Sequence, residues 1–413
     1  MGCDILFVSH LTAAEQWALP GMDTYFGSLP QQLRGFGHRV RIALIDHTAT
    51  PFADFPTRPD AAVDLPRTLL PRRLDRAEEA AIANRLAAVA ADLRAGSGHA
   101  DLRRLAARQA AQGPARQSLR IATAIARLAA RHRPRALVLT YEGHAWERMA
   151  MRLSRQAVPG LRCLAVHHAI LAPMQQAMAT RYGALVDPDV ILAAGRAAFD
   201  WLSQAPGLRG LPIDLLGSPR ARPAAPAPTG PKDGMGVLFL PEGMLSESTR
   251  LALAAYALAA ARPDLTCTIR LHPLTSRAAL AAAEPRLRLS PPNVDWSPPD
   301  RPLDEDARRA TWAVYRGSSA VLSAMAAGAV PVYLGDEPAE LRIDPLRGAG
   351  AIVQIVPRTE DLAEALQAQE IRTERLRDGW AYAQSYYTPM DPEALLRHMI
   401  KVATPSPPVQ DTP

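Results

Sequence analysis

The stretch that decides the fold is Tyr315-Arg-Gly-Ser-Ser-Ala-Val-Leu-Ser-Ala-Met-Ala-Ala-Gly-Ala-Val-Pro-Val-Tyr333. The apolar residues Thr311–Val314 just before it predict a buried strand. Small residues after the two serines predict a helix, and Val330-Pro-Val332 opens a second strand. A strand, a tight turn, a helix and another strand form the unit from which parallel, doubly wound sheets are built.

The turn inside this stretch carries residues suited to binding a phosphate group. Backbone N–H groups at the start of a helix have no partner within the helix, and the positive end of the helix dipole attracts anions. A glycine lets the backbone come close to a ligand. We therefore predict a phosphate site here, and the alternative is a serine that only caps a strand-to-helix turn. The residues assigned to this site are Arg316, Gly317, Ser318 and Ser319.

Length and composition bound the class of protein. The chain has 413 residues, which exceeds the usual size of a single core and predicts two domains. No uncharged apolar run reaches the roughly 18 residues of a membrane span. The N-terminus enters a strand directly, without the features of a secretory signal, so we expect a cytoplasmic protein. The three cysteines are far apart and predict buried thiols.

The net charge of +6 is modest and suits more than one kind of partner. It is compatible with anionic substrates and leaves peripheral contact with the anionic inner membrane open. The sequence has no RNP motif, zinc finger or basic DNA-binding helix, so nucleic acid is not an expected partner.

Alternating strand and helix patterns predict an α/β fold of two Rossmann-like domains with a cleft between them. Because ligands of such sheets bind at the carboxyl ends of the strands, we expect the active site in that cleft. We expect a first domain at 1–218 with a helical insertion at about 70–133, a Pro-rich linker at 219–235 and a second domain at 236–380. A C-terminal helix at 381–403 is expected to cross back onto the first domain, and a disordered tail should follow at 404–413. Strands are expected at 4–9, 39–45, 136–140, 162–166, 190–193 and 213–216, and then at 236–240, 266–271, 293–296, 311–315, 330–334 and 351–355.

Two strand ends of the second domain carry further candidates. Arg270 and His272 alternate with a leucine, so both should leave the sheet on the same side, and Pro273 ends the ladder beyond them. A cation and an imidazole there suit the phosphate of a nucleotide, although a solvated strand end is the alternative. Glu242, at the end of an earlier strand, is a candidate acceptor of hydrogen bonds from a ribose or a base.

The first domain offers candidates for acid–base chemistry at the end of its strand 136–140. Glu142, His144 and Glu147 share one strand-to-helix turn with Trp146. We predict Glu142 as the general base toward an acceptor hydroxyl and Glu147 as the second candidate. Helix capping and surface pairing are the alternative roles for these acids.

Three histidines are expected to line an acceptor pocket in the same domain. His10 lies at the end of the first strand, and the adjacent His167 and His168 follow another strand. Neighbouring residues on a strand face opposite ways, so one of this pair should contact ligand while the other packs. No metal site is predicted, because Asp187-Pro-Asp189 precedes a strand in a pattern typical of a turn. No cofactor is predicted either, since the sequence lacks GxGxxG and GxxxxGK[ST].

The strand-end Leu271-His-Pro273 and the segment 317–332 together resemble GT-B glycosyltransferases. The likeness is greatest to bacterial surface-polysaccharide enzymes, among them capsule and lipopolysaccharide Kdo transferases and sialyltransferase-like proteins. The resemblance implies that His272, Ser318 and Ser319 hold the phosphate of a nucleotide-sugar donor, often CMP-linked, without a bound metal. CDP-glycerol glycerophosphotransferases carry similar features.

These observations predict a glycosyltransferase that moves a sugar, such as Kdo or another acidic sugar, from a nucleotide donor to a surface glycan or glycolipid. The donor would bind the second domain and the acceptor the first. A CDP-polyol phosphotransferase, a sugar-nucleotide epimerase and a non-catalytic nucleotide-sugar-binding partner protein are the alternatives.

Overall fold

The structure, a computed structural model, describes residues 2–57, 65–170, 176–223, 226–232, 234–338, 341–366 and 371–399. The chain divides into two compact units. Unit 1 contains Met1–His168, Ala177–Arg220 and the segment from Thr388 onward, and unit 2 contains Ala221–Tyr387 with the short segment Ala169–Gln176. The tail predicted at 404–413 lies outside the described residues.

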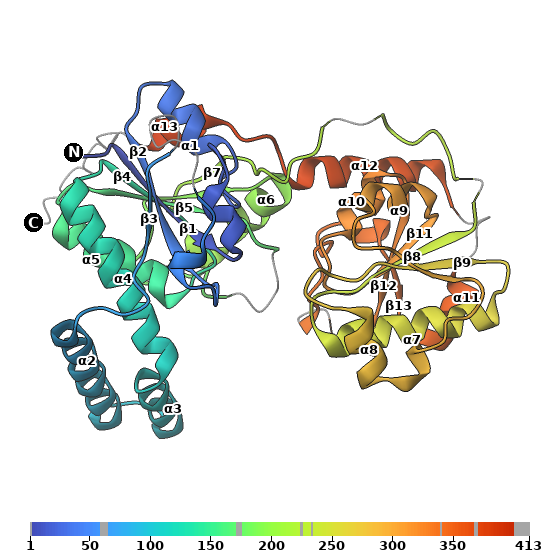
Figure 1. The fold of residues 1–413 in the computed structure, drawn as a ribbon, viewed down its shortest axis with the longest axis horizontal. Helices are drawn as coiled ribbons and strands as arrows, with labels where there is room; N and C mark the ends of the chain where they lie inside the picture. The colour runs from blue at the N-terminus through green and yellow to red at the C-terminus, as the bar shows by residue number, and fades with distance from the viewer. Residues whose placement is uncertain are drawn as a thin grey trace, which may run out of the picture. The chain divides into compact units, whose positions relative to one another are not determined.

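Unit 1 is built on a parallel sheet in which the described residues form seven strands in the order β3-β2-β1-β4-β5-β6-β7 (Figure 1). Most of these strands are largely apolar, and most of their side chains are buried on both faces, as in other parallel sheets covered by helices. The strands are β1 (Ile5–Leu11), β2 (Val40–Asp46), β3 (Arg67–Leu69), β4 (Ala136–Thr140), β5 (Arg162–Val166), β6 (Val190–Ala193) and β7 (Ile213–Leu215).

The helices of unit 1 include a long insertion between β3 and β4, as the sequence predicts. The helices are α1 (Leu29–Gly35), α2 (Arg76–Ala95), α3 (Ala100–Ala110), α4 (Gly113–His132), α5 (Ala145–Ala157), α6 (Arg196–Gln204) and α13 (Pro392–Met399). Asp75 begins α2 by accepting a hydrogen bond from the Glu78 N–H at 2.9 Å, which satisfies one of the free donors of the first turn. Residues of α1 and α13 share one core cluster with Ile5, Phe7 and Val138 of the sheet.

Unit 2 repeats the architecture with a parallel sheet whose described strands run in the order β10-β9-β8-β11-β12-β13. They are β8 (Gly236–Leu240), β9 (Thr266–Ile269), β10 (Val294–Trp296), β11 (Trp312–Tyr315), β12 (Val330–Leu334) and β13 (Gln354–Val356). Its helices are α7 (Leu245–Ala261), α8 (Arg277–Ala283), α9 (Leu303–Arg309), α10 (Val321–Ala326), α11 (Leu362–Ala365) and α12 (Thr373–Tyr386). The two sheets confirm the predicted pair of Rossmann-like domains.

The strand order places a topological switch point in each unit. In unit 1 the chain passes from β1 outward through β2 and β3, and then returns to add β4 on the other side of β1. In unit 2 the same reversal occurs between β8 and β11. Loops that leave two neighbouring strands in opposite directions open a crevice at their carboxyl ends, and this crevice is where open α/β sheets bind ligands.

Most expected strands end within two residues of the observed bounds, and three details differ by more. The strand β3 was not predicted, because it has only three residues and includes Arg67. Residues 351 and 352, predicted as part of a strand, belong instead to a 3-10 turn (Gly350–Ile352), and β13 begins only at Gln354. The described part of the helix predicted at 381–403 belongs to two helices, α12 of unit 2 and α13 of unit 1, which are separated by the proline-containing segment 387–391, and residues 400–403 lie outside the described residues.

Candidate active site

The switch point of unit 1 holds a hydrogen-bonded chain of polar side chains. His10 lies in β1, and its Nε2 is 2.9 Å from Oγ1 of Thr140, the last residue of β4. Its Nδ1 is 2.8 Å from Nε2 of His47, which directly follows β2. These contacts join the carboxyl ends of three neighbouring strands, so the residues lie where the topology predicts a ligand crevice.

Glu142 binds two imidazoles just beyond the end of β4. Its Oε1 is 3.2 Å from His168 Nε2, and its Oε2 is 3.4 Å from His144 Nε2. His168 is mostly buried, whereas 59% of the His144 side chain is exposed. The structure therefore brings together the predicted base Glu142 with the predicted residues His144 and His168, and it leaves His144 accessible to a substrate.

Burial and neighbouring charges set the protonation of this cluster. Hydrogen bonds from His144 and then from His168 hold the pKa of Glu142 well below its usual range. The same bond to Glu142 raises the pKa of His144. Burial, reinforced by His47, lowers the pKa of His10 to about 3, so this imidazole is neutral across the physiological range. The cluster thus combines an ionised carboxylate with an exposed imidazole that binds a proton readily.

A turn with a left-handed glycine positions Glu142 and His144. Gly143 has φ +82°, and a Cβ at this residue would come within 2.5 Å of the Met178 backbone nitrogen. Only glycine fits this close approach without strain. Trp146, on the first turn of α5, packs edge-to-face with His10 at 5.6 Å between ring centroids.

Tyr25 is placed in the cluster by a buried acid on the loop after β1. Asp23 accepts hydrogen bonds from the hydroxyl of Ser9 at 2.8 Å and from the N–H of Tyr25 at 2.8 Å. The Tyr25 ring then packs edge-to-face against His10 at 5.2 Å and against His168 at 4.8 Å. An aromatic ring thus joins the two imidazoles of the predicted acceptor pocket.

Glu147, the second candidate base, is buried at the start of α5 and bound to the backbone. Its side chain is 1% exposed and accepts hydrogen bonds from the N–H of Glu142 at 3.0 Å and from the N–H of His144 at 2.7 Å. Burial raises its pKa to about 8. These backbone contacts are those expected for the capping alternative.

The two adjacent histidines after β5 separate as their alternation predicts. His167 is 1% exposed, and neither of its ring nitrogens has a hydrogen-bond partner in the described part of the chain. Burial lowers the pKa of His167 to about 3. It therefore packs as a neutral ring and does not line the predicted acceptor pocket, whereas His168 turns toward Glu142.

The switch point of unit 2 gathers residues from the ends of three strands. A Cβ on Gly317, after β11, would lie 2.5 Å from Glu242 Oε2, so the missing side chain leaves room for this carboxylate. A Cβ on Gly243 would lie 3.1 Å from His272 Nδ1. Glu242, His272 and Gly317 are thus neighbours at the carboxyl ends of β8, β9 and β11. Burial, together with the nearby Glu247, raises the pKa of Glu242.

The serine turn differs from the prediction in one respect. Helix α10 begins at Val321 and has six residues, with Ala320 at its N-cap, so neither serine caps it. Ser318 is nearly buried, Ser319 is half-buried and Pro273 is exposed. A phosphate here would rely on the backbone and hydroxyls of the turn more than on a helix dipole, because so short a helix has a weak dipole.

The two arginines predicted to bind phosphate are engaged in ion pairs within unit 2. Arg316 Nε lies 2.5 Å from Glu247 Oε2, Arg316 also pairs with Glu337, and its Nη1 donates to the Leu334 carbonyl at 2.7 Å. Arg270 Nη1 lies 2.9 Å from Asp306 Oδ2. Both guanidinium groups already pair with carboxylates, so Arg316 and Arg270 hold the strand ends together. These contacts give no support to the phosphate-binding role predicted for the two arginines.

His47 and Thr140 belong to the polar cluster of unit 1 but were not predicted from the sequence. The rule that selected His10, namely a polar side chain at the carboxyl end of a strand, applies equally to both, because His47 follows β2 and Thr140 ends β4. Glu337 was missed because it lies three residues beyond β12, in a loop without a recognisable motif. Within the described ranges, no group of three or more His, Cys, Asp or Glu side chains is placed to hold a metal ion.

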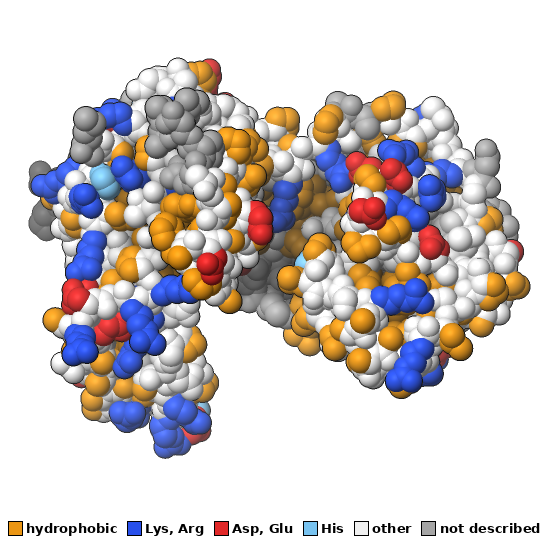
Figure 2. Space-filling model, in the orientation of Figure 1, with side chains coloured by type: hydrophobic (Ala, Val, Ile, Leu, Met, Phe, Trp, Pro, Cys, Tyr) orange, Lys and Arg blue, Asp and Glu red, His pale blue; other side chains and the backbone are white. Residues whose placement is uncertain are grey.

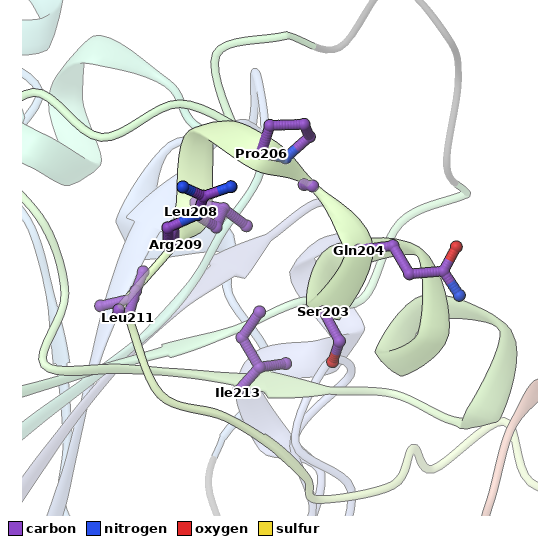
Figure 3. A pocket seen from close by; sticks show the side chains of 9 residues that line it. Ser203, Gln204, Pro206, Leu208, Arg209, Leu211 and Ile213 are labelled. Atoms are coloured by element: carbon purple, nitrogen blue, oxygen red, sulfur yellow. The ribbon is translucent and has the colours of Figure 1, made fainter.

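A surface pocket of unit 1 lies away from these residues. It is formed at the end of α6 and the start of β7 (Figure 3). The pocket therefore lies at the amino ends of the parallel strands, whereas His10 lies near their carboxyl ends. Its lining contains none of the predicted site residues: Ser203, Gln204, Ala205, Pro206, Leu208, Arg209, Gly210, Leu211 and Ile213. None of the chain's described helices is long and apolar enough to cross a membrane.

Comparisons with known proteins identify the fold. No protein-family model and no curated protein sequence matches the chain. Among solved structures, the calicheamicin glycosyltransferase CalG4 is similar with a TM-score of 0.57 and 15% identity, covering 98% of this chain and 100% of the other. The glycotransferase of kitacinnamycin has a TM-score of 0.53 and 14% identity, over 93% and 96% of the two chains.

A UDP-GlcNAc 2-epimerase from Methanocaldococcus jannaschii is similar as well, with a TM-score of 0.51 and 12% identity over 95% of this chain and 98% of the other. At such identities the likeness is one of fold. The chain has the GT-B type of architecture, with two Rossmann-like domains, and this architecture serves both transferases and epimerases.

Proposed function

We propose that the protein is a glycosyltransferase that moves a sugar from a nucleotide-activated donor to an acceptor hydroxyl. The observation that carries the proposal is the Glu142–His144 pair at the switch point of unit 1, 3.4 Å between Oε2 and Nε2, in a chain of GT-B fold. A carboxylate that orients an exposed imidazole is the arrangement from which general bases are built.

In the proposed reaction His144 accepts the proton of the acceptor hydroxyl while Glu142 stabilises the imidazolium that forms. The acceptor oxygen bonds to the anomeric carbon of the sugar. The bond from that carbon to the donor phosphate breaks, and its electron pair leaves with the phosphate oxygen. This proposal departs from the sequence-based prediction that Glu142 is itself the general base, because here His144 takes the proton and Glu142 positions and stabilises it.

The donor nucleotide is proposed to bind the switch point of unit 2. His272, Ser318, Ser319 and the backbone of Gly317 would contact the phosphate, and Glu242 would accept hydrogen bonds from the ribose or the base. The raised pKa of Glu242 supports this placement, because a carboxyl group that is more easily neutralised repels a phosphate less. No metal or cofactor is included in the proposal.

The identity of the substrates rests on the resemblance of 271–273 and 317–332 to surface-polysaccharide enzymes. It favours a CMP-linked donor carrying Kdo or another acidic sugar, and a surface glycan or glycolipid as the acceptor. We propose that the reaction takes place in the cytoplasm, with peripheral contact at the inner membrane where the acceptor is a glycolipid.

A sugar-nucleotide epimerase is the second candidate, because epimerases share this fold at TM-scores of 0.51 and 0.52.

Thermal unfolding with CMP, CDP, UDP and GDP would first identify the nucleotide, since a ligand that binds only the folded state raises its stability. Product analysis with the matching sugar nucleotide would then separate the reactions. A glycoside and free nucleotide support the transferase, a phosphodiester indicates a polyol phosphotransferase, and an epimerised sugar nucleotide without acceptor indicates the epimerase. Stabilisation by none of the four nucleotides would contradict the proposal, whereas stabilisation with none of these products would favour a non-catalytic nucleotide-sugar-binding partner protein.

A further inference from the structure

The helices α2 and α3 form a hairpin that extends from unit 1 and is supported at its base by α4 (Figure 1). Few of its described side chains are buried: Ile82 and Ala90 in α2, and Ala107 in α3. A hairpin that contributes so little to a core presents most of its surface to the outside. Its faces are therefore free to bind a partner.

The outer surface of α3 has an apolar stripe beside a basic one. Leu102 and Leu105, three residues apart, share one face of the helix and are 65% and 49% exposed. Arg104 and Arg108, four residues apart, occupy the adjacent face and are also exposed, and the exposed Asp101 on this side of the helix pairs with Arg104. The buried Ala107 marks the side that packs on the rest of the hairpin. Exposed leucines flanked by arginines are typical of helices that lie in a membrane interface.

Charge on the outer half of the hairpin is strongly biased. Residues 85–108 contain five arginines and two aspartates, which gives 5 − 2 = +3. Arg85, Arg94 and Arg108 form no side-chain ion pair or hydrogen bond with any residue that the structure describes. Figure 2 shows blue and orange side chains next to one another over α2 and α3. The hairpin therefore combines uncompensated positive charge with exposed apolar surface.

We propose that the outer surface of the α2–α3 hairpin docks on the headgroups of anionic membrane lipids, with Leu102 and Leu105 entering the interface. Anionic headgroups complement the net positive charge, and long arginine side chains reach phosphates while their stems stay near apolar surface. A second copy of the chain fits less well, because two such hairpins would repel. Two leucines also offer far less area than the roughly 800 Å² per partner of a stable interface.

Sedimentation of the full chain with vesicles tests this proposal. Vesicles of phosphatidylcholine containing a third phosphatidylglycerol should bind the protein, and vesicles of pure phosphatidylcholine should not. Arg104→Gln/Arg108→Gln should weaken binding roughly 30-fold, about fivefold for each positive charge near the surface. Leu102→Ser/Leu105→Ser should weaken vesicle binding several-fold. It should also reduce the fraction of vesicle binding that persists at high salt.

Matched controls lie on unit 2, where Leu289 is 84% exposed next to the exposed Arg288. Arg288→Gln and Leu289→Ser should bind vesicles as the wild type does. The proposal is overturned if the wild type does not sediment with anionic vesicles, or if the hairpin variants bind like the controls. It is also overturned if the hairpin variants abolish a dimer in solution. Because the readout is vesicle binding, either result leaves the proposed transfer reaction untouched.

Discussion

Replacing Glu142 by glutamine removes the charge beside His144 while keeping the shape of the side chain. Oε2 of Glu142 is 3.4 Å from His144 Nε2. At this separation a pair of unit charges attracts by about 1.2 kcal/mol in bulk water and about 5 kcal/mol at an effective dielectric constant of 20. Because 59% of the His144 side chain is exposed, the lower figure applies. Loss of about 1.2 kcal/mol from the stabilisation of an imidazolium in the transition state slows the reaction about eightfold.

The carboxylate also orients the imidazole, and general-base catalysis as a whole contributes about 100-fold or more. We therefore expect Glu142→Gln to lower kcat/KM by between about eightfold and about 100-fold. The pH dependence should change as well. A base must be neutral to act, and Glu142 raises the pKa of His144, so wild-type activity should rise with pH through a value above the ordinary imidazole pKa. In Glu142→Gln that rise should move to lower pH.

The assay is release of nucleotide from the donor that stabilises the protein, measured from pH 5 to pH 9 in wild type, Glu142→Gln, His144→Gln and the double variant. If the two residues act as a unit, the double variant should be no slower than the slower single variant. Glu393→Gln, an exposed acid of the same unit, is the matched control. A Glu142→Gln enzyme within twofold of wild type, with an unmoved pH profile, would refute the role assigned to this pair.

Three further changes test the surroundings of the two switch points. Gly317→Ala places a methyl group 2.5 Å from Glu242 Oε2, so the carboxylate must rotate away, and nucleotide should no longer raise the melting temperature as it does in wild type. Glu147 has a folded-state pKa of about 8, above its ordinary 4.5, so the free energy of unfolding should fall as pH rises between these values; in Glu147→Gln, urea titrations should show this slope removed. Arg316→Met removes the cation paired with the partly buried Glu247 and leaves Glu337 with only Arg250 at 3.5 Å, so it should lower the free energy of unfolding by about 3 kcal/mol. Arg286→Met, which removes an exposed arginine, should leave urea unfolding unchanged.

The sheets were predictable because their strands are short, almost wholly apolar runs bounded by turn residues. The expected bounds of 136–140, 162–166, 190–193, 236–240 and 330–334 match β4, β5, β6, β8 and β12. Strand β3 could not be found in this way, since it is an edge strand of three residues whose arginine interrupts the apolar pattern.

Only those residues of the candidate site that lie at the carboxyl end of a recognisable strand could be predicted from the sequence. Position at a carboxyl end singled out His10 and Glu142, and the structure places both at one switch point. The partners of each side chain could not be read from the sequence, because ion pairs such as that of Arg316 with Glu337 join residues 21 apart through the register of two strands. From the sequence alone, Arg316 beside the glycine–serine turn looks like a free cation, because its partners Glu247 and Glu337 are brought to it only by the fold.

Hydrogen–deuterium exchange with and without the stabilising nucleotide shows whether ligands bind at the switch points. We expect slower exchange in peptides that contain Glu242–Gly243, His272 and Gly317–Ser319, and unchanged exchange around the pocket at α6 and β7. Nucleotide binding that protects the α6–β7 pocket, or any other region, while these three segments exchange as before would contradict the account.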